Sequence, residues 1–299
     1  LKLTFASNNP FFAIALFYRM NILEDILKFN TLTNKKVEES KDFFINKILN
    51  LSLIADLLYK RNFNNTFNKI LNIMSKSELN IDDKILEVTS FEGLTCFSYS
   101  LFNLCLVLPF NNLESKIGKK LVSSSEFISA KALMLANEEL DRINKITSLL
   151  NDFCQLKNEF INTDKFDRLK TALLIRKLGF KNLLLMTLLS ISHEYSEKFN
   201  VEITVKENKL IIENVIKTEE LINIANSFIK YLEEIDVNKL LRSDEIKPII
   251  DGNEVMNLFN IRGNKISSVL SKCIEIQVLF PKLNKQEITE LITKDINNI

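Results

Sequence analysis

The stretch IDGNEVMNLFNIRGNKISSVLSKCIEIQVLF, residues 250–280, has the pattern of two helices joined by a tight turn. Asp251 can cap the first helix, with Glu254 three residues later as its capping-box partner. Gly263 lies in the turn, where glycine permits a positive φ that strains other residues. Aliphatic residues then return at helical spacing until Pro281. This pattern predicts a helical hairpin near the end of the chain.

The turn at Gly263 has two interpretations. Free backbone N–H groups at the start of the second helix, together with the helix dipole, can hold a phosphate between Arg262 and Lys265. Alternatively, Gly263 is simply the C-cap of the first helix, between two packed helices. On spacing alone we favour the cap.

The rest of the chain also predicts a mostly helical protein. Its 299 residues are 46% hydrophobic, with only five glycines and four prolines, so it can bury a sizeable core in helices. Apolar patterns predict a helix over 10–29, at least two helices in 41–76, and buried helices over 86–110 and 183–192.

Two more features complete the predicted fold. Asn137 can cap a helix whose first turn carries Glu138 and Glu139, and Asn284 with Glu287 forms another capping box. Alternation within residues 200–215 indicates one small β-hairpin near 201–212. We therefore expect an all-α, elongated helical body and tail.

Composition narrows the classes of function. The formal net charge of +1 means that any nucleic-acid binding must use local basic patches. No apolar run is long and clean enough to span a bilayer. Four cysteines without a CxxC pair, and a single histidine, argue against a zinc site and favour free thiols in a reducing compartment.

Residues 245–295 resemble the tail of the eukaryotic-type CCA-adding enzymes, the class II tRNA nucleotidyltransferases of the poly(A) polymerase family. The shared order is KPIIDG, an apolar helix, a turn around Gly263, a second helix and a closing helix at 284–294. The family usually has Pro-Gly-Pro at the turn, whereas this chain has Arg-Gly-Asn. A weaker similarity covers 115–190, where Arg176 and Gly179 match an arginine shortly before a glycine, without the tryptophan that often follows in the family.

The resemblance implies that the body and tail grip a tRNA acceptor arm by shape and phosphate contacts, while a head domain performs catalysis. In the family, the head holds Mg²⁺ on two aspartates behind a glycine-rich loop, and a neck reads CTP or ATP. Asp82-Asp83 is adjacent rather than alternate, and Glu24-Asp25 lacks the arginine of the neck signature. We therefore expect no catalytic and no metal-binding residue here, and an inactive chain on its own. The head then belongs to the rest of a longer enzyme or to a separate chain.

The resemblance also implies a division of the chain and a set of contacts. We expect a helix following the neck at 1–30, a helical body at 31–240 and a helical tail at 241–299. The expected partner is tRNA, not DNA or a membrane, in the cytoplasm, nucleus or mitochondrion. The candidate tRNA-binding residues are Lys116, Lys119, Lys120, Arg168, Lys170, Arg176, Lys177, Lys181, Arg262, Gly263 and Lys265.

The alternative is a non-enzymatic all-helical protein that binds RNA or another protein. Its basic stretches would then be solvated faces, which is what most single basic runs are.

Overall fold

The computed structural model describes residues 10–28, 41–59, 64–76, 91–117, 119–199, 202–206, 209–213 and 216–295. Asp82 and Asp83, which sequence analysis set aside as metal ligands, lie outside the described residues.

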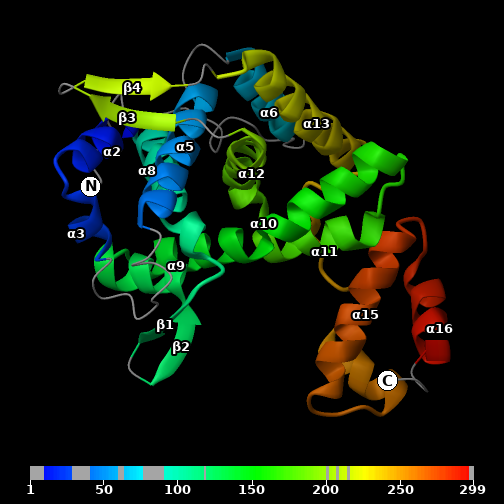
Figure 1. The fold of residues 1–299 in the computed structure, drawn as a ribbon. Coiled ribbons are helices and arrows are strands. Elements are labelled where there is room, and N and C mark those ends of the chain that lie inside the picture. Colours follow the sequence, from blue (N-terminus) through cyan, green and yellow to red (C-terminus); the bar gives the residue numbers. More distant parts are fainter. Residues whose placement is uncertain are drawn as a thin grey trace.

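The helices of the body surround a central helix, and a helical tail follows (Figure 1). In chain order, the body begins with α2 (Pro10–Arg19), α3 (Leu23–Leu27), α5 (Lys41–Tyr59), α6 (Asn64–Lys76) and α8 (Phe91–Val107), which continues into the 3₁₀ turn η3 (Leu108–Phe110). It continues with α9 (Ser124–Phe127), the π-helical turn η4 (Ile128–Ala132), α10 (Asn137–Thr163), α11 (Arg168–Leu178), the 3₁₀ turn η5 (Phe180–Asn182) and α13 (Thr218–Val237). The central helix is α12 (Leu183–Lys198). The 3₁₀ turn η6 (Ser243–Glu245) leads into the tail, which contains α14 (Gly252–Phe259), α15 (Lys265–Leu279) and α16 (Lys285–Asp295).

The prediction of a mostly helical protein is confirmed. The antiparallel hairpin of β3 (Glu202–Lys206) and β4 (Lys209–Glu213) lies where the alternation placed it. A further antiparallel hairpin, β1 (Glu114–Ile117) with β2 (Lys120–Ser123), was not predicted.

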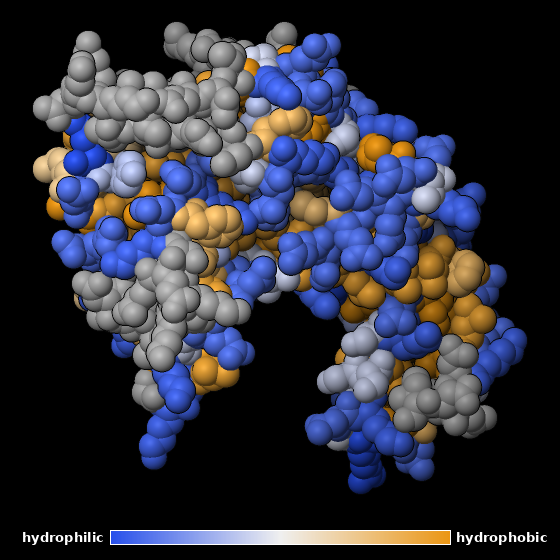
Figure 2. Space-filling view, viewed as in Figure 1, coloured by the Kyte–Doolittle hydropathy of each residue, from blue (hydrophilic) through white to orange (hydrophobic). Residues whose placement is uncertain are grey.

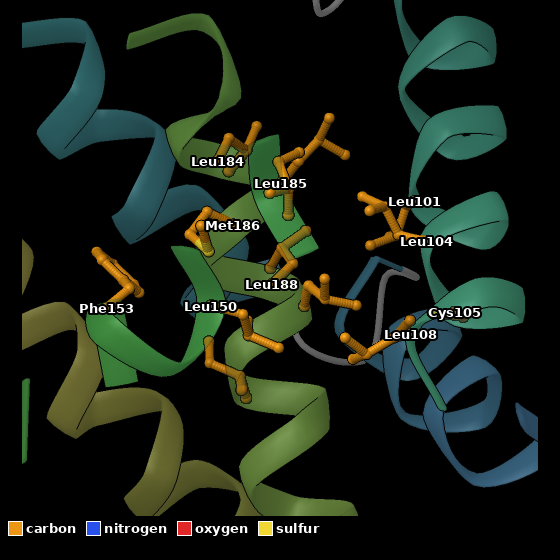
Figure 3. Packing of buried hydrophobic residues seen from close by; sticks show 14 of the residues in the cluster. Leu101, Leu104, Cys105, Leu108, Leu150, Phe153, Leu184, Leu185, Met186 and Leu188 are labelled. Atoms are coloured by element: carbon orange, nitrogen blue, oxygen red, sulfur yellow. The ribbon is translucent and has the colours of Figure 1, made fainter. Parts of the chain in front are cut away.

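The body core is built around α12. All residues from Leu183 to Ser192 are buried, as the apolar run predicted, and α12 packs against α5, α8, α10 and α13. Figure 3 shows side chains of α8, α10 and α12 gathered in this core, among them Leu104, Leu150 and Leu188. The predicted buried helix within 86–110 is also confirmed as α8.

Two helix predictions were wrong in detail. The helix expected over 10–29 is broken into α2 and α3 at Asn21, whose φ of 55° is left-handed; asparagine adopts this conformation more readily than most residues. Asn137 does not cap α10 but is its first residue, because the N-cap is Ala136, which makes no side-chain cap bond. Glu138 and Glu139 do lie in the first turn, where carboxylates suit the helix dipole.

A buried lysine of α10 contacts two other helices inside the body. Lys157 of α10 is only 2% exposed, and its Nζ lies 2.5 Å from Glu194 Oε2 of α12. The same ammonium lies 4.4 Å from the centre of the Phe228 ring of α13. Lys198 Nζ donates to the other carboxylate oxygen of Glu194 at 2.7 Å. The carboxylate and the ring therefore replace much of the water that the buried ammonium loses on folding.

The tail has a hydrophobic core of its own, and both predicted capping boxes are confirmed. Its buried residues are Ile250, Val255, Val269, Cys273, Ile276, Ile288 and Ile292. Asp251 accepts from the backbone N–H of Glu254, whose carboxylate accepts from the N–H of Asp251. Asn284 and Glu287 make the same reciprocal pair.

Replacing Asp251 with alanine is expected to destabilise the start of α14 by about 1 kcal/mol, because it removes the acceptor for two backbone N–H groups. Amide exchange in α14 should then speed up about fivefold while α12 is unaffected. Hydrogen-exchange mass spectrometry measures both. Asn253→Ala, at an exposed position whose side chain is not part of the capping box, is the control. Equal exchange in the two variants would contradict this role of Asp251.

Candidate nucleic-acid interface

The molecule has a hollow along one edge, which Figure 2 shows between two projecting parts. One is the β1–β2 hairpin, here called the hairpin arm (residues 113–124). The other is the tail, here called the tail arm (residues 250–295). In Figure 1, α10 and α11 run between the two arms. The hollow is therefore a concave face with an arm on each side.

The hairpin arm is held to the body by small polar side chains. Asn111 donates from Nδ2 to the carbonyl oxygen of Thr147 in α10 at 3.2 Å and accepts from Ser125 Oγ at 3.1 Å. The hydroxyls of Ser115 and Ser124, both buried, share a hydrogen bond of 2.7 Å at the base of the arm. Because these groups satisfy one another, the base of the arm can be polar and still buried.

The tip of the hairpin arm is basic. Ile117 is paired with Lys120 at the end of the hairpin. Lys116, Lys119 and Lys120 are exposed, and no acidic residue lies between Glu114 and Glu126. Lys120 Nζ lies 3.5 Å from Glu126, but its side chain is 75% exposed, so this ion pair holds it only weakly.

The turn of the tail arm confirms one expectation about Gly263 and overturns another. Gly263 has a φ of +66°, as predicted. The C-cap of α14, however, is Asn260, with a φ of 55°, so the cap interpretation of Gly263 is wrong. Gly263 instead precedes α15, where its carbonyl oxygen accepts from the N–H of Ile266 at 3.1 Å. No described atom lies within 4 Å of a Cβ built at Gly263, so glycine is required here by backbone conformation and not by space.

The start of α15 is electropositive. Its N-cap, Asn264, makes no side-chain bond to the first turn, and that turn contains no acid. Arg262 and Lys265 are exposed beside it. From Val255 to Ile274 the chain has three basic residues and no acidic one. The positive end of the helix dipole and these side chains therefore act together on any anion nearby.

The basic stretch in and around α11 does not form one surface. Lys170, Lys177 and Lys181 are exposed, although Lys170 lies 3.2 Å from Asp167. Arg168 and Arg176 are half-buried, and their guanidinium groups donate to groups of the protein itself. The structure therefore separates the three lysines from the two arginines, which the sequence had grouped together.

The single histidine lies in the body, on α12. His193 is half-buried, and its Nδ1 lies 3.9 Å from Glu197 Oε1. Burial holds the pKa of His193 below its ordinary value. Across the described ranges, no group of three or more His, Cys, Asp or Glu side chains is placed to hold a metal ion. In the same described part of the chain, no helix is both long enough and apolar enough to cross a membrane.

The hairpin arm was not predicted, although the sequence contains a signal for it. Residues 114–123, ESKIGKKLVS, place Gly-Lys between two short β-compatible runs, which is typical of a two-residue hairpin connection.

Comparison of the chain with family models, with curated proteins and with solved structures found no match. The resemblance of residues 245–295 to the CCA-adding enzymes is therefore carried only by the residues quoted for it.

Proposed function

We propose that the chain binds the acceptor arm of a tRNA in the hollow, with the hairpin arm and the tail arm contacting phosphates on either side. The observation that supports this best is the pair of exposed basic tips that flank one concave face, each in a stretch of chain without acidic residues. Phosphate binding depends on local positive charge, so a net charge of +1 does not oppose it.

The chemistry of the tips favours sequence-independent contacts. Four of the five tip bases, Lys116, Lys119, Lys120 and Lys265, are lysines, which act as flexible point charges toward phosphate. An A-form RNA duplex is recognised largely by its shape and its backbone, which suits a concave face with charged edges. Arg262 completes the set, and Gly263 sets the backbone of the turn.

In this proposal the chain acts as the body and tail of a CCA-adding nucleotidyltransferase. The chain supplies the grip on tRNA, while Mg²⁺, CTP and ATP are bound by a head and neck. Lys170, Lys177 and Lys181 remain candidate phosphate contacts, because they are exposed on or next to α11. Arg168 and Arg176 are not included among these contacts here, because part of each guanidinium group donates to acceptors of the protein itself.

A competition experiment tests the proposal. A labelled RNA acceptor-stem hairpin is bound to the purified chain and displaced with unlabelled RNA or with a DNA hairpin of the same sequence. The RNA should compete at least about tenfold better, because the B-form duplex differs in groove shape and lacks the 2′-hydroxyls. Equal competition, or absence of binding at about 0.1 M salt, would contradict the proposal and favour the non-enzymatic alternative with solvated basic faces.

A further inference from the structure

The tail meets the body at one end of α15. Ile274 and Val278, in its last turns, belong to the body core, whereas Val269 and Cys273 belong to the core of the tail. The basic turn with Arg262 lies at the opposite end of the same helix. Because α15 has 15 residues, it is a rod of about 22 Å that carries the tail tip away from the body.

Arg168 of α11 holds the body end of this rod. Its Nε donates to the carbonyl oxygen of Val278 at 2.6 Å, and one terminal nitrogen donates to Asn238 Oδ1 at 2.9 Å. Val278 lies in the last turn of α15, where carbonyl groups lack partners within the helix. The cation therefore satisfies an orphan acceptor and also faces the negative end of the helix dipole.

Arg176 holds the segment that leads into the tail. One terminal nitrogen donates to the carbonyl oxygens of Ser243 and Ile246, at 3.2 and 2.6 Å. The same segment is tied back by Asp244 Oδ2, which accepts from the N–H of Phe180 at 2.9 Å. The guanidinium of Arg242 lies 4.0 Å from the centre of the Phe180 ring. Segment 242–246 is thus attached to α11 and to the turn that follows it.

The two arginines hold the tail region at two separate points along α11. Arg168 and Arg176 are eight residues apart on α11, which is about 12 Å along the helix axis. Together with the packing of Ile274 and Val278 in the body core, two separated polar contacts restrict the direction of the tail more than a single one would. A swing of about 20° at the joint would move the far end of α15 by about 8 Å.

We propose that Arg168 and Arg176 are positioning residues that fix the angle of the tail and so set the spacing between the hairpin arm and the tail arm. The effect of this spacing on RNA rests on the proposed function, but the spacing itself does not. Both arms contribute to one affinity only if their geometry permits simultaneous contact with the same duplex.

The spacing is measured directly between fluorophores placed by unnatural amino acids at Leu121 of β2 and Ser268 of α15, both exposed. The Arg168→Gln/Arg176→Gln variant should broaden and shift the distance distribution, by several ångströms at the tail tip. Lys217→Gln/Lys230→Gln, which removes the same charge at the start of and within α13, should leave the distribution unchanged. An unchanged distribution in the arginine variant overturns the inference.

Arg168→Lys keeps the inference testable if the double variant unfolds. It retains the charge but lacks the planar fork that reaches both Val278 and Asn238, so it should also broaden the distribution. A distribution identical to that of the unchanged chain would count against the proposal as firmly as the first result. Circular dichroism and thermal unfolding show that each variant is folded.

Affinity for an RNA acceptor-stem hairpin separates this inference from the proposed function. If the unchanged chain binds the hairpin and the arginine variant binds it about tenfold more weakly, with a shallower salt dependence, the positioning role and the proposed function are both supported. A broadened distance with unchanged affinity overturns the positioning role in binding. If the unchanged chain does not bind RNA, the proposed function fails, while the distance measurement still decides whether the arginines fix the tail.

Discussion

Replacing Glu194 with leucine is expected to lower the free energy of unfolding by about 3–5 kcal/mol, because it leaves the ammonium of Lys157 buried without its counter-ion. Lys157 is 2% exposed, so it cannot recover its hydration without opening the body. The Phe228 ring, 4.4 Å away, offsets only about 2 kcal/mol of this cost.

Denaturant unfolding monitored by circular dichroism measures this cost. Glu197→Leu is the matched control: Glu197 lies three residues further along α12 and pairs with Lys47, but its side chain is 49% exposed, so its loss should cost about 1 kcal/mol or less. The double variant Lys157→Met/Glu194→Leu should regain most of the lost stability, because no charge is then buried unpaired. Equal losses for Glu194→Leu and Glu197→Leu would show that the buried pair has no special role.

The same pair predicts an acid dependence. Burial raises the pKa of Glu194, but hydrogen bonds from Lys157 and Lys198 and their charges outweigh it, so the pKa lies below its ordinary value. Because the folded pKa is depressed, the stabilisation is complete above the unfolded value of about 4.3 and is lost as pH falls through the folded value. The unchanged chain should therefore lose more stability than the Met/Leu double variant between about pH 5 and pH 3.

Reversing two charges on each arm, with Lys119→Glu, Lys120→Glu, Arg262→Glu and Lys265→Glu, is expected to weaken RNA binding at least about 100-fold at about 0.1 M salt. Each phosphate that a basic side chain neutralises releases counter-ions, and at that salt concentration the release is worth up to about tenfold in affinity. The slope of log affinity against log salt should fall by about one for each phosphate that is no longer neutralised. All four side chains are exposed, so the fold should be retained.

Pairs of substitutions separate the arms from overall charge. Lys119→Glu/Lys120→Glu and Arg262→Glu/Lys265→Glu should each lower the salt slope by about two. Lys217→Glu/Lys230→Glu makes the same change in net charge away from both arms and should lower it far less. If the salt slope fell by the same amount in all three double variants, total charge and not the two arms would account for binding.

Features encoded within a few residues could be predicted from the sequence. The capping boxes at Asp251 and Asn284 each span four residues, so the local pattern alone is sufficient. The buried helix α12 could also be predicted, because the run at 183–192 is mostly apolar and is too short to span a membrane.

Features that depend on partners far away in the sequence could not be predicted. Arg168 and Arg176 lie in one basic run with Lys170 and Lys177, but their carbonyl partners on Val278 and Ser243 are 110 and 67 residues away. The partner of Lys157 is 37 residues away. A count of charges along the chain therefore cannot distinguish a basic side chain that faces solvent from one that holds two elements together.

The salt dependence of affinity for an RNA acceptor-stem hairpin tests the central claim most directly, because it counts the phosphates that the two arms are proposed to neutralise. The five tip bases, at about −0.9 each, predict a straight line with a slope of about −4 to −5. Absence of saturable binding at about 50 mM salt, or a slope close to zero, would contradict the claim that the two arms grip an RNA backbone.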